Sequence, residues 1–400
     1  MRIAWLAAGL TLATSVACGG VDRPGNSTSA PACAHGPNLV QATSSVIVSP
    51  TDVGMVGGMS ALIELSPPVA ATDGKTILAA WTAGDASGVT LGHAVVAHLG
   101  TGGVAGTSAP IDAPALPVSA FDGTNFLVSG RAGGPPSLPT APTSIQLQRV
   151  ALDGSAVGGP QTIETVQGPG SVTSAVWTPQ GLAVAWWASD PLTTAVQLFG
   201  DDGHLIRGLV LDPTVDEPGT SLKGFAPAAV ALFDGQLVVA NAHAVSTLDW
   251  LGGPAQTSQT GFIVSVPQKG GFPTLFDTGG QLRMWGSGGE PFDAGGLDPD
   301  AGPIDGVYAG APGGPFAQVG AVDSYAVTQA SDGCGGAVTL SNRNASLGVV
   351  SDTAPERVVS LGTTLTNVVD PVAAMAATPS GFAVVWVADD GMHLATLAWE

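Results

Sequence analysis

Hydrophobic residues in this chain gather in short runs, and each run follows a polar turn that ends in glycine. The clearest case is Thr178–Asp190, TPQGLAVAWWASD, which returns as Thr378–Asp390, TPSGFAVVWVADD, at an offset of 200 residues (378 − 178). Weaker copies recur at intervals from 45 residues (280 − 235) to 58 residues (181 − 123). Short apolar runs bounded by Gly, Asp and Pro predict β-strands. The marker glycines are Gly74, Gly123, Gly181, Gly235, Gly280, Gly333 and Gly381.

The residues around each marker glycine predict four short strands per repeat. A small-residue strand precedes the turn, an apolar strand often closed by Trp follows it, and two looser strands complete the unit. Asp-Gly and Pro-x-Gly turns supply the positive φ that tight hairpins need. Four antiparallel strands at this period are typical of a propeller blade. We therefore expect an all-β fold, a β-propeller of seven four-stranded blades. The fifth and sixth units fit least well, so six or eight blades, or a tandem of β-sandwiches, are the alternatives.

The two ends of the repeat region predict how the ring closes. Glu400 follows directly on a third strand, so the last blade lacks a fourth strand of its own. Ser44–Pro50, SSVIVSP, has a strand pattern but precedes the first repeat. We expect this segment to complete the last blade, which leaves no open edge in the ring.

Composition and charge support an all-β protein and exclude one class of partner. Only 10% of the residues are charged and only three are lysines, whereas Gly (57) and Pro (31) are abundant. Helix-rich proteins normally carry many Lys, Glu and Arg residues on their wet faces. The formal net charge is −20, without a basic patch, so we expect no binding to nucleic acid. Anionic lipid head groups repel the same charge, so membrane attachment requires an anchor.

The N-terminal residues supply a candidate anchor. Ile3–Ala17 is an apolar run too short to span a bilayer but suited to an export signal. Ser15-Val16-Ala17-Cys18 resembles the lipobox of bacterial lipoproteins, with Ser15 where that family usually carries an aliphatic residue. The resemblance implies cleavage before Cys18, a lipid on Cys18, and a place at the outer membrane or cell surface of a Gram-negative bacterium. An ordinary cleavage site at the same bond is the alternative, and it predicts a secreted or periplasmic soluble protein.

These observations divide the chain into three parts. Residues 1–17 are the expected export signal, residues 18–43 a small, polar and Pro-rich tether, and residues 44–400 the propeller domain. The only cysteines are Cys18, Cys33 and Cys334. If Cys18 carries lipid, Cys33–Cys334 is the only intramolecular disulfide that the chain can form.

Few sequence motifs point to chemistry. Asp298, Asp300 and Asp305 in DPDAGPIDG are weak candidates for a calcium site, but Gly302 stands where a third oxygen ligand is expected and Pro303 follows. A solvated long loop is the simpler interpretation, so we expect no metal or other cofactor. The histidines show no zinc-binding pattern, and His93 and His98 fall on opposite faces of one predicted strand. Gly200–His204 is expected to be a hairpin turn, and no Gly-x-Ser-x-Gly elbow occurs.

Two hypotheses about function follow. The first is a monomeric, lipid-anchored, non-catalytic scaffold whose irregular loops bind a protein or glycan of the envelope. The second is a polysaccharide lyase or hydrolase with its site at the mouth of the central channel. Glycoside hydrolysis requires paired carboxylates, and most carboxylates of this chain fall at predicted turns. A cluster of carboxylates or histidines with apolar walls at one end of the channel would favour the enzyme.

Overall fold

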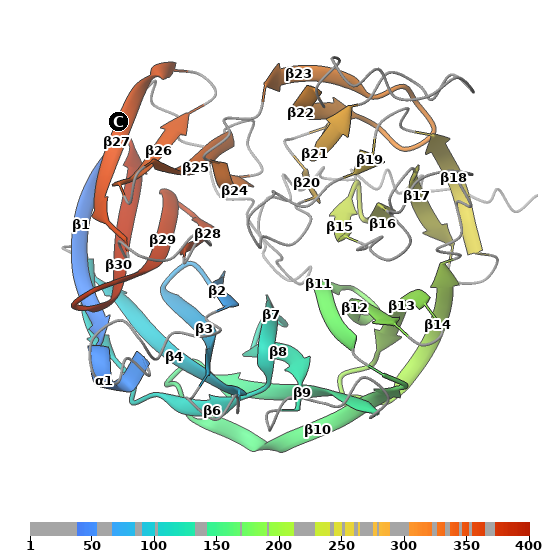
Figure 1. Cartoon of the computed structure of the whole chain (residues 1–400), viewed down its shortest axis with the longest axis horizontal. Helices are drawn as coiled ribbons and strands as arrows, with labels where there is room; N and C mark the ends of the chain where they lie inside the picture. The colour runs from blue at the N-terminus through green and yellow to red at the C-terminus, as the bar shows by residue number, and fades with distance from the viewer. Residues whose placement is uncertain are drawn as a thin grey trace, which may run out of the picture.

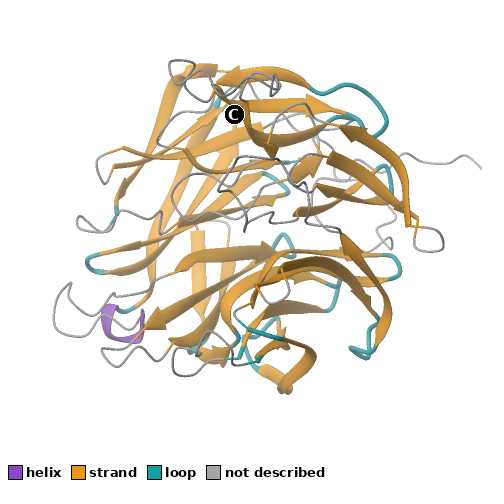
Figure 2. Ribbon diagram, turned by 45° about the vertical axis from the view of Figure 1, so that its right-hand side comes forward, coloured by secondary structure: helices purple, strands orange, loops and turns teal. Residues whose placement is uncertain are grey.

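A computed structural model describes the chain from residue 38 onward, with gaps. The described residues are 38–53, 66–84, 90–100, 103–132, 142–168, 170–189, 192–211, 229–240, 244–249, 253–259, 263–264, 275–277, 280–288, 304–321, 326–332, 337–343, 346–351, 354–364 and 373–400. Apart from the one-turn helix α1 (Pro50–Val53), every regular element among them is a strand, as Figure 2 shows. None of the helical structure described is long and apolar enough to cross a membrane.

The strands form seven antiparallel sheets arranged as blades around a central axis, so the chain is a seven-bladed β-propeller, as predicted (Figure 1). Blade 1 contains β2 (Ser66–Thr72), β3 (Thr76–Gly84), β4 (Thr90–Gly100), β5 (Gly103–Thr107) and β6 (Ile111–Ala113). Blade 2 contains β7 (Ala115–Phe121), β8 (Asn125–Arg131), β9 (Thr143–Ala151) and β10 (Ala156–Val166). Blade 3 contains β11 (Gly170–Thr178), β12 (Gly181–Ser189), β13 (Leu192–Phe199) and β14 (Leu205–Leu211).

The remaining four blades complete the circle. Blade 4 contains β15 (Ala229–Phe233), β16 (Gln236–Ala240), β17 (Ala244–Asp249) and β18 (Gly253–Gln259). Blade 5 contains β19 (Ile263–Val264), β20 (Leu275–Asp277), β21 (Leu282–Gly288), β22 (Ile304–Gly310) and β23 (Ala317–Ala321). Blade 6 contains β24 (Ala326–Ser331), β25 (Ala337–Arg343), β26 (Ser346–Ser351) and β27 (Ala354–Thr363). Blade 7 contains β28 (Ala373–Thr378), β29 (Gly381–Ala388), β30 (Gly391–Trp399) and β1 (Leu39–Val48).

The ring closes as the sequence predicts, through the strand that precedes the first repeat. β1 pairs antiparallel with β30, so blade 7 combines the two ends of the propeller domain. This strand begins at Leu39, earlier than the expected start at Ser44, because the pairing continues to Leu39 opposite Trp399. Backbone hydrogen bonds between Asn38 and Glu400 in both directions extend the contact by one more residue.

The repeated turn of the sequence joins the first and second strands of the blades. Among the marker glycines that the structure describes, all have positive φ, for example +136° at Gly181 and +155° at Gly381. In Gly181, an added Cβ would lie 2.0 Å from the backbone oxygen of Phe199, on the third strand of the same blade. The turn is therefore restricted to glycine by its backbone angle and by close contact with a neighbouring strand.

The fifth blade departs from the regular pattern. β19 and β20 both pair with β21, β19 opposite Gly286–Ser287 and β20 opposite Leu282–Met284. Two separate segments thus cover the inner edge of β21 where other blades have one strand.

The core lies between the blades. Apolar clusters join blades 7 and 1, 1 and 2, 2 and 3, 3 and 4, 4 and 5, and 6 and 7. Successive side chains of a strand point to opposite faces, so a blade can contribute apolar side chains to the clusters on both of its sides. We call the interface between two neighbouring blades a seam.

Connections of different length leave the two ends of the blades. Turns from first to second and from third to fourth strand are short, as at 73–75, 152–155, 179–180 and 379–380, and they define the short-turn face. Connections from second to third strand and from blade to blade leave the opposite end, because antiparallel strands alternate in direction. They include residues 54–65, 133–141, 212–228 and 289–303 of the sequence and define the long-loop face.

Candidate functional site

The first group of interacting polar side chains lies in the seam between blades 7 and 1. Trp81 on β3 stands directly opposite His93 on β4, so both side chains point to the same face of the sheet. Their ring centroids are 5.5 Å apart at an interplanar angle of 36°. Trp81 is fully buried, and its Nε1 donates a hydrogen bond of 3.2 Å to the carbonyl oxygen of Val53 in α1. The indole thus connects blade 1 to the segment that follows β1.

His93 of this group is half-buried and has an acidic neighbour. Its Nδ1 lies 3.9 Å from Oδ1 of Asp112, which belongs to β6 and is fully exposed. Burial lowers the pKa of His93, and the charge of Asp112 offsets only part of that effect. The imidazole is therefore held mainly in its neutral form at neutral pH.

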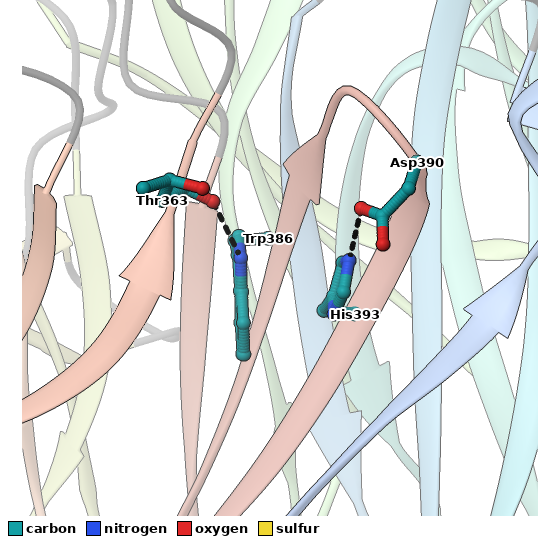
Figure 3. Close-up of polar contacts among 4 residues, drawn as sticks. All are labelled: Thr363, Trp386, Asp390 and His393. Atoms are coloured by element: carbon teal, nitrogen blue, oxygen red, sulfur yellow. Dashed lines mark hydrogen bonds and ion pairs between the residues drawn. The ribbon is translucent and has the colours of Figure 1, made fainter.

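Blade 7 contains a closely similar group, shown in Figure 3. Trp386 on β29 stands opposite His393 on β30, with ring centroids 5.0 Å apart at 17°. Nε1 of Trp386 donates a 3.2 Å hydrogen bond to the carbonyl oxygen of Thr363, at the end of β27 in blade 6. Nε2 of His393 lies 2.7 Å from Oδ1 of Asp390 in the adjoining turn. This hydrogen bond to His393 lowers the pKa of Asp390.

A third tryptophan is bound to the preceding blade in a related way. Nε1 of Trp186 on β12 donates to Oε1 of Gln197 on β13 at 2.6 Å. Nε2 of Gln197 in turn donates to Oε2 of Glu164 on β10 of blade 2, also at 2.6 Å. In two of these seams the indole N–H donates to a backbone carbonyl from the side of the preceding blade, whereas Trp186 donates to Gln197 of its own blade, and Gln197 makes the contact with the preceding blade.

The chemistry that these groups support is limited by their arrangement. A histidine oriented by a carboxylate is suited to proton transfer, but it needs a nucleophile or a substrate within hydrogen-bond reach. The two His–Asp pairs lie in different seams, and each supplies only two potential ligands for a metal. Within the part of the chain that the structure describes, no group of three or more His, Cys, Asp or Glu residues could hold a metal ion.

The strands nearest the axis carry almost no charge. β2, β7, β11, β15, β20, β24 and β28 are rich in Ala, Val, Ser and Thr, and Asp277 at the end of β20 is their only charged residue. Small neutral residues fit where seven strands converge on one axis.

Aspartates of the short-turn face are engaged by their own turns. Oδ1 of Asp73 accepts hydrogen bonds from the backbone N–H groups of Lys75 (2.8 Å) and Thr76 (2.6 Å). Oδ1 of Asp122 likewise accepts from the backbone N–H groups of Thr124 (2.7 Å) and Asn125 (2.6 Å). These carboxylates stabilise hairpins in the manner expected of Asx turns. Residues 69–76, VAATDGKT, thus form a strand–hairpin–strand segment.

Most of the site residues predicted from the sequence lie outside the residues that the structure describes. Cys18, Cys33, Cys334, Asp298 and Asp300 fall outside the described residues, and Asp305 is described only through its backbone in β22. His93 and His98 do share one strand, β4, and Gly200–His204 is a hairpin turn between β13 and β14.

The Trp–His pairs are the feature that sequence reasoning missed. Trp81 lies three residues before the end of β3 (84 − 81), and His93 lies three residues after the start of β4 (93 − 90). Trp386 and His393 are likewise each two residues from their strand ends (388 − 386 and 393 − 391). In each pair, Trp and His lie at equal distances from the connection between the second and third strands, and this equal spacing in the sequence could have identified them as partners.

Comparison with known proteins adds only the fold. No family model and no curated protein matches the chain. Among solved structures, the Pan2 WD40 domain of Neurospora crassa is 11% identical, with 92% of this chain and 97% of that chain covered and a TM-score of 0.48. The β-propeller domain of the trilobed protease from Pyrococcus furiosus is also 11% identical (82% and 93% covered, TM-score 0.46). A putative 6-phosphogluconolactonase from Bacteroides fragilis is 14% identical (81% and 86% covered, TM-score 0.47).

Proposed function

We propose that this propeller is a non-catalytic scaffold that binds a protein or glycan of the bacterial envelope on its long-loop face. The observation that carries the proposal is the unequal distribution of connections between the two faces. The short-turn face is built from tight hairpins, whereas 54–65, 133–141, 212–228 and 289–303 all leave from the long-loop face. Irregular segments held by a rigid scaffold are the usual place for recognition.

The structural use of the polar side chains supports this proposal. His93 and His393, each beside a carboxylate, lie with their rings against tryptophans that join neighbouring blades. Asp73 and Asp122 at the short-turn face are bound within their own hairpins. These groups contribute to the stability of the ring, and no described residue gives a specific observation in favour of the polysaccharide-acting enzyme.

We also propose that Cys18 is lipidated and attaches the propeller to the outer membrane or cell surface. Residues 18–37 would connect this anchor to Asn38, which is fixed to Glu400 by two backbone hydrogen bonds. A link of this composition, rich in Gly, Ser and Pro, gives the propeller reach and freedom to orient its loops. The same contact supports a disulfide between Cys33 and Cys334, because Nε1 of Trp399 donates to Oδ2 of Asp332, two residues before Cys334.

Binding to isolated outer-membrane vesicles tests the function directly. The purified full chain, with Cys18→Ser to remove the anchor, is compared with a variant in which a short Gly-Ser linker replaces residues 289–303. The matched control replaces residues 311–316, a turn of the same blade on the short-turn face. We expect saturable binding by the parent chain and the control and at least about a tenfold weaker affinity for the 289–303 variant.

Pretreatment of the vesicles identifies the class of partner. Loss of binding after protease treatment indicates a protein, and loss after periodate oxidation indicates a glycan. Equal binding by all three chains, or none by any, would exclude a scaffold that uses this loop. Turnover of envelope polysaccharide by the parent chain would establish the enzyme instead. Labelling of the unmodified chain by a fatty-acid analogue, lost in Cys18→Ser, tests the anchor separately.

A further inference from the structure

The chain enters the propeller at the short-turn face. Leu39, the first residue of β1, stands opposite Trp399, the last residue of β30. The backbone N–H of Trp399 donates a 3.1 Å hydrogen bond to the carbonyl oxygen of Ser380, in the short turn between β28 and β29. Asn38 and Glu400 exchange two backbone hydrogen bonds next to this pair. Residues that precede Asn38 are therefore attached to the propeller from the short-turn face.

Contacts with the ring fix this entry point. β1 is the outermost strand of blade 7 (Figure 1), and its pairing with β30 continues to Val48, opposite Met392. Val48 is buried in the apolar cluster that joins blades 7 and 1. At the other end of β1, Oδ1 of Asn38 accepts a hydrogen bond from Nη1 of Arg357, which belongs to β27 of blade 6. The position of Asn38 is thus set by blades on both sides of β1.

The height of the propeller exceeds the usual reach of the tether. β1 has 10 residues and crosses from the short-turn face to the long-loop face, a distance of about 30 Å at about 3.3 Å per residue. Residues 18–37, between the proposed anchor and Asn38, number 20 (37 − 18 + 1). A Gly- and Ser-rich link of that length has a root-mean-square end-to-end distance of about 25 Å. To place the long-loop face at the membrane, the tether would have to run back along the whole blade in an unusually extended form.

We propose that the tether turns the short-turn face of the anchored protein towards the membrane and the long-loop face away from it. The inference rests on the proposed anchor at Cys18, and it narrows the proposed function. Access to the long-loop face is then from the aqueous side, so its partner is a protein domain or glycan that stands clear of the lipid surface. Lipid head groups and the membrane-embedded parts of proteins are excluded as partners of this face.

The side chains of the short-turn face suit a place beside the lipid and not within it. Asp153 in the turn between β9 and β10, and Asp201 and Asp202 in the turn between β13 and β14, are all exposed. Charged side chains stay out of hydrocarbon, and aspartates are repelled by anionic head groups. The tether alone therefore holds this face near the membrane, and zwitterionic lipid is the appropriate surface for a test.

Fluorescence quenching at the two ends of one strand tests the orientation. β29 of blade 7 runs between the turns 379–380 on the short-turn face and 389–390 on the long-loop face, and both Ser380 and Asp389 are exposed. The full lipidated chain carries a fluorophore coupled to azidophenylalanine at one of these two positions, and its cysteines are left unchanged. Each protein is reconstituted into phosphatidylcholine vesicles that contain a nitroxide on the lipid head group. We expect the label at position 380 to be quenched at least about twofold more than the label at position 389.

A longer tether is the matched control. Insertion of about 40 Gly and Ser residues between Ser29 and Ala30 raises the root-mean-square length of the tether to about 40 Å, more than the height of the blade. The difference in quenching between the two positions should then fall by at least about half.

The outcomes separate the orientation from the anchor and from the scaffold function. Equal or stronger quenching at position 389 with the native tether, or a difference that the longer tether leaves unchanged, would overturn the proposal for a protein that sediments with the vesicles. A protein that does not sediment with them overturns the anchor and the orientation together. Binding by the long-loop face is measured separately, with the Cys18→Ser chain, and depends on neither result.

Discussion

At the scale of single residues, the tryptophans near the long-loop face show how an indole ring, which is apolar except for its N–H group, is buried between blades. Trp81 and Trp386 are almost completely buried, and each indole N–H reaches a carbonyl oxygen contributed from the side of the neighbouring blade. The histidine opposite each one covers the ring face and keeps its own polar edge near a carboxylate. Such an arrangement buries a large apolar surface while the indole N–H keeps a hydrogen-bond partner.

The lowered pKa of His93 makes the stability of the protein depend on pH. The unfolded chain takes up a proton at a higher pH than the folded protein does, so folding is favoured most when the imidazole is neutral. The contribution of His93 is therefore complete above its ordinary value of 6.5 and is lost as the pH falls below that value towards the folded pKa.

We expect the free energy of unfolding, measured by urea titration, to fall between about pH 8 and about pH 5.5, with a shallower fall in His93→Phe. Phe keeps an aromatic ring on Trp81 but cannot take up a proton. His204→Phe, at an exposed hairpin turn, is the control and should follow the wild type. A slope in His93→Phe that is as steep as that of the wild type would show that other groups cause the pH dependence.

At the scale of elements, the repeated phrase of the sequence corresponds to one hairpin of the blade. In blade 3, Thr178 at the end of the first strand pairs with Gly181 at the start of the second. In blade 7, Thr378 pairs with Gly381 in the same way. Both glycines have positive φ and both lie against the backbone of a third strand. The repeat is therefore a packing requirement between three strands as well as a turn preference.

This requirement predicts the effect of Gly381→Ala. An added Cβ would lie 2.2 Å from the carbonyl oxygen of Leu397 and would sit at a φ of +155°. Backbone strain contributes about 1–3 kcal/mol and the clash adds to it, so we expect a loss of about 3 kcal/mol or more in urea denaturation. Gly235→Ala is the control, because its φ is +72° but no atom lies within 4 Å of its added Cβ. We expect about 1–2 kcal/mol there, and a loss in Gly381→Ala no larger than this would contradict the packing explanation.

Hairpins of this kind can be predicted from the sequence, whereas residue pairing across the blades cannot. Asp-Gly and Pro-x-Gly turns followed by apolar runs identify the first two strands of the blades because both signals are local. Bulges shift the register between strands, as between Val172 and Ser174 opposite Ala185–Trp186. A shift of one residue reverses the face of every later side chain. The strand pairs that contain the Trp–His pairs have no such bulge, so these pairs could be predicted only if the ends of both strands were known, and the sequence places strand ends less well than strands.

At the scale of the whole molecule, the number of blades follows from the spacing of the marker glycines. The closure of the ring follows from the strand pattern that precedes the first repeat. The identity of the partner does not, because ligand contacts depend on where distant loops converge in space. The calcium candidates Asp298 and Asp300 lie outside the described residues. The two ends of the propeller domain meet in the pairing of β1 with β30.

This contact leads to the prediction that Cys33 and Cys334 form a disulfide. Backbone hydrogen bonds join Asn38 to Glu400, and Nε1 of Trp399 donates a hydrogen bond to Asp332. Asn38, five residues after Cys33, and Asp332, two residues before Cys334, are therefore both held at the C-terminal end of β30. The five residues from Cys33 to Asn38 (38 − 33) can extend at most about 3.6 Å each, which is ample for this approach.

In Cys18→Ser protein from an oxidising compartment, we expect no reactive thiol after denaturation without reductant. Cys33→Ser in the same background should expose one thiol and lower the free energy of unfolding by about 2–4 kcal/mol. Two reactive thiols in the oxidised parent protein would exclude the pairing.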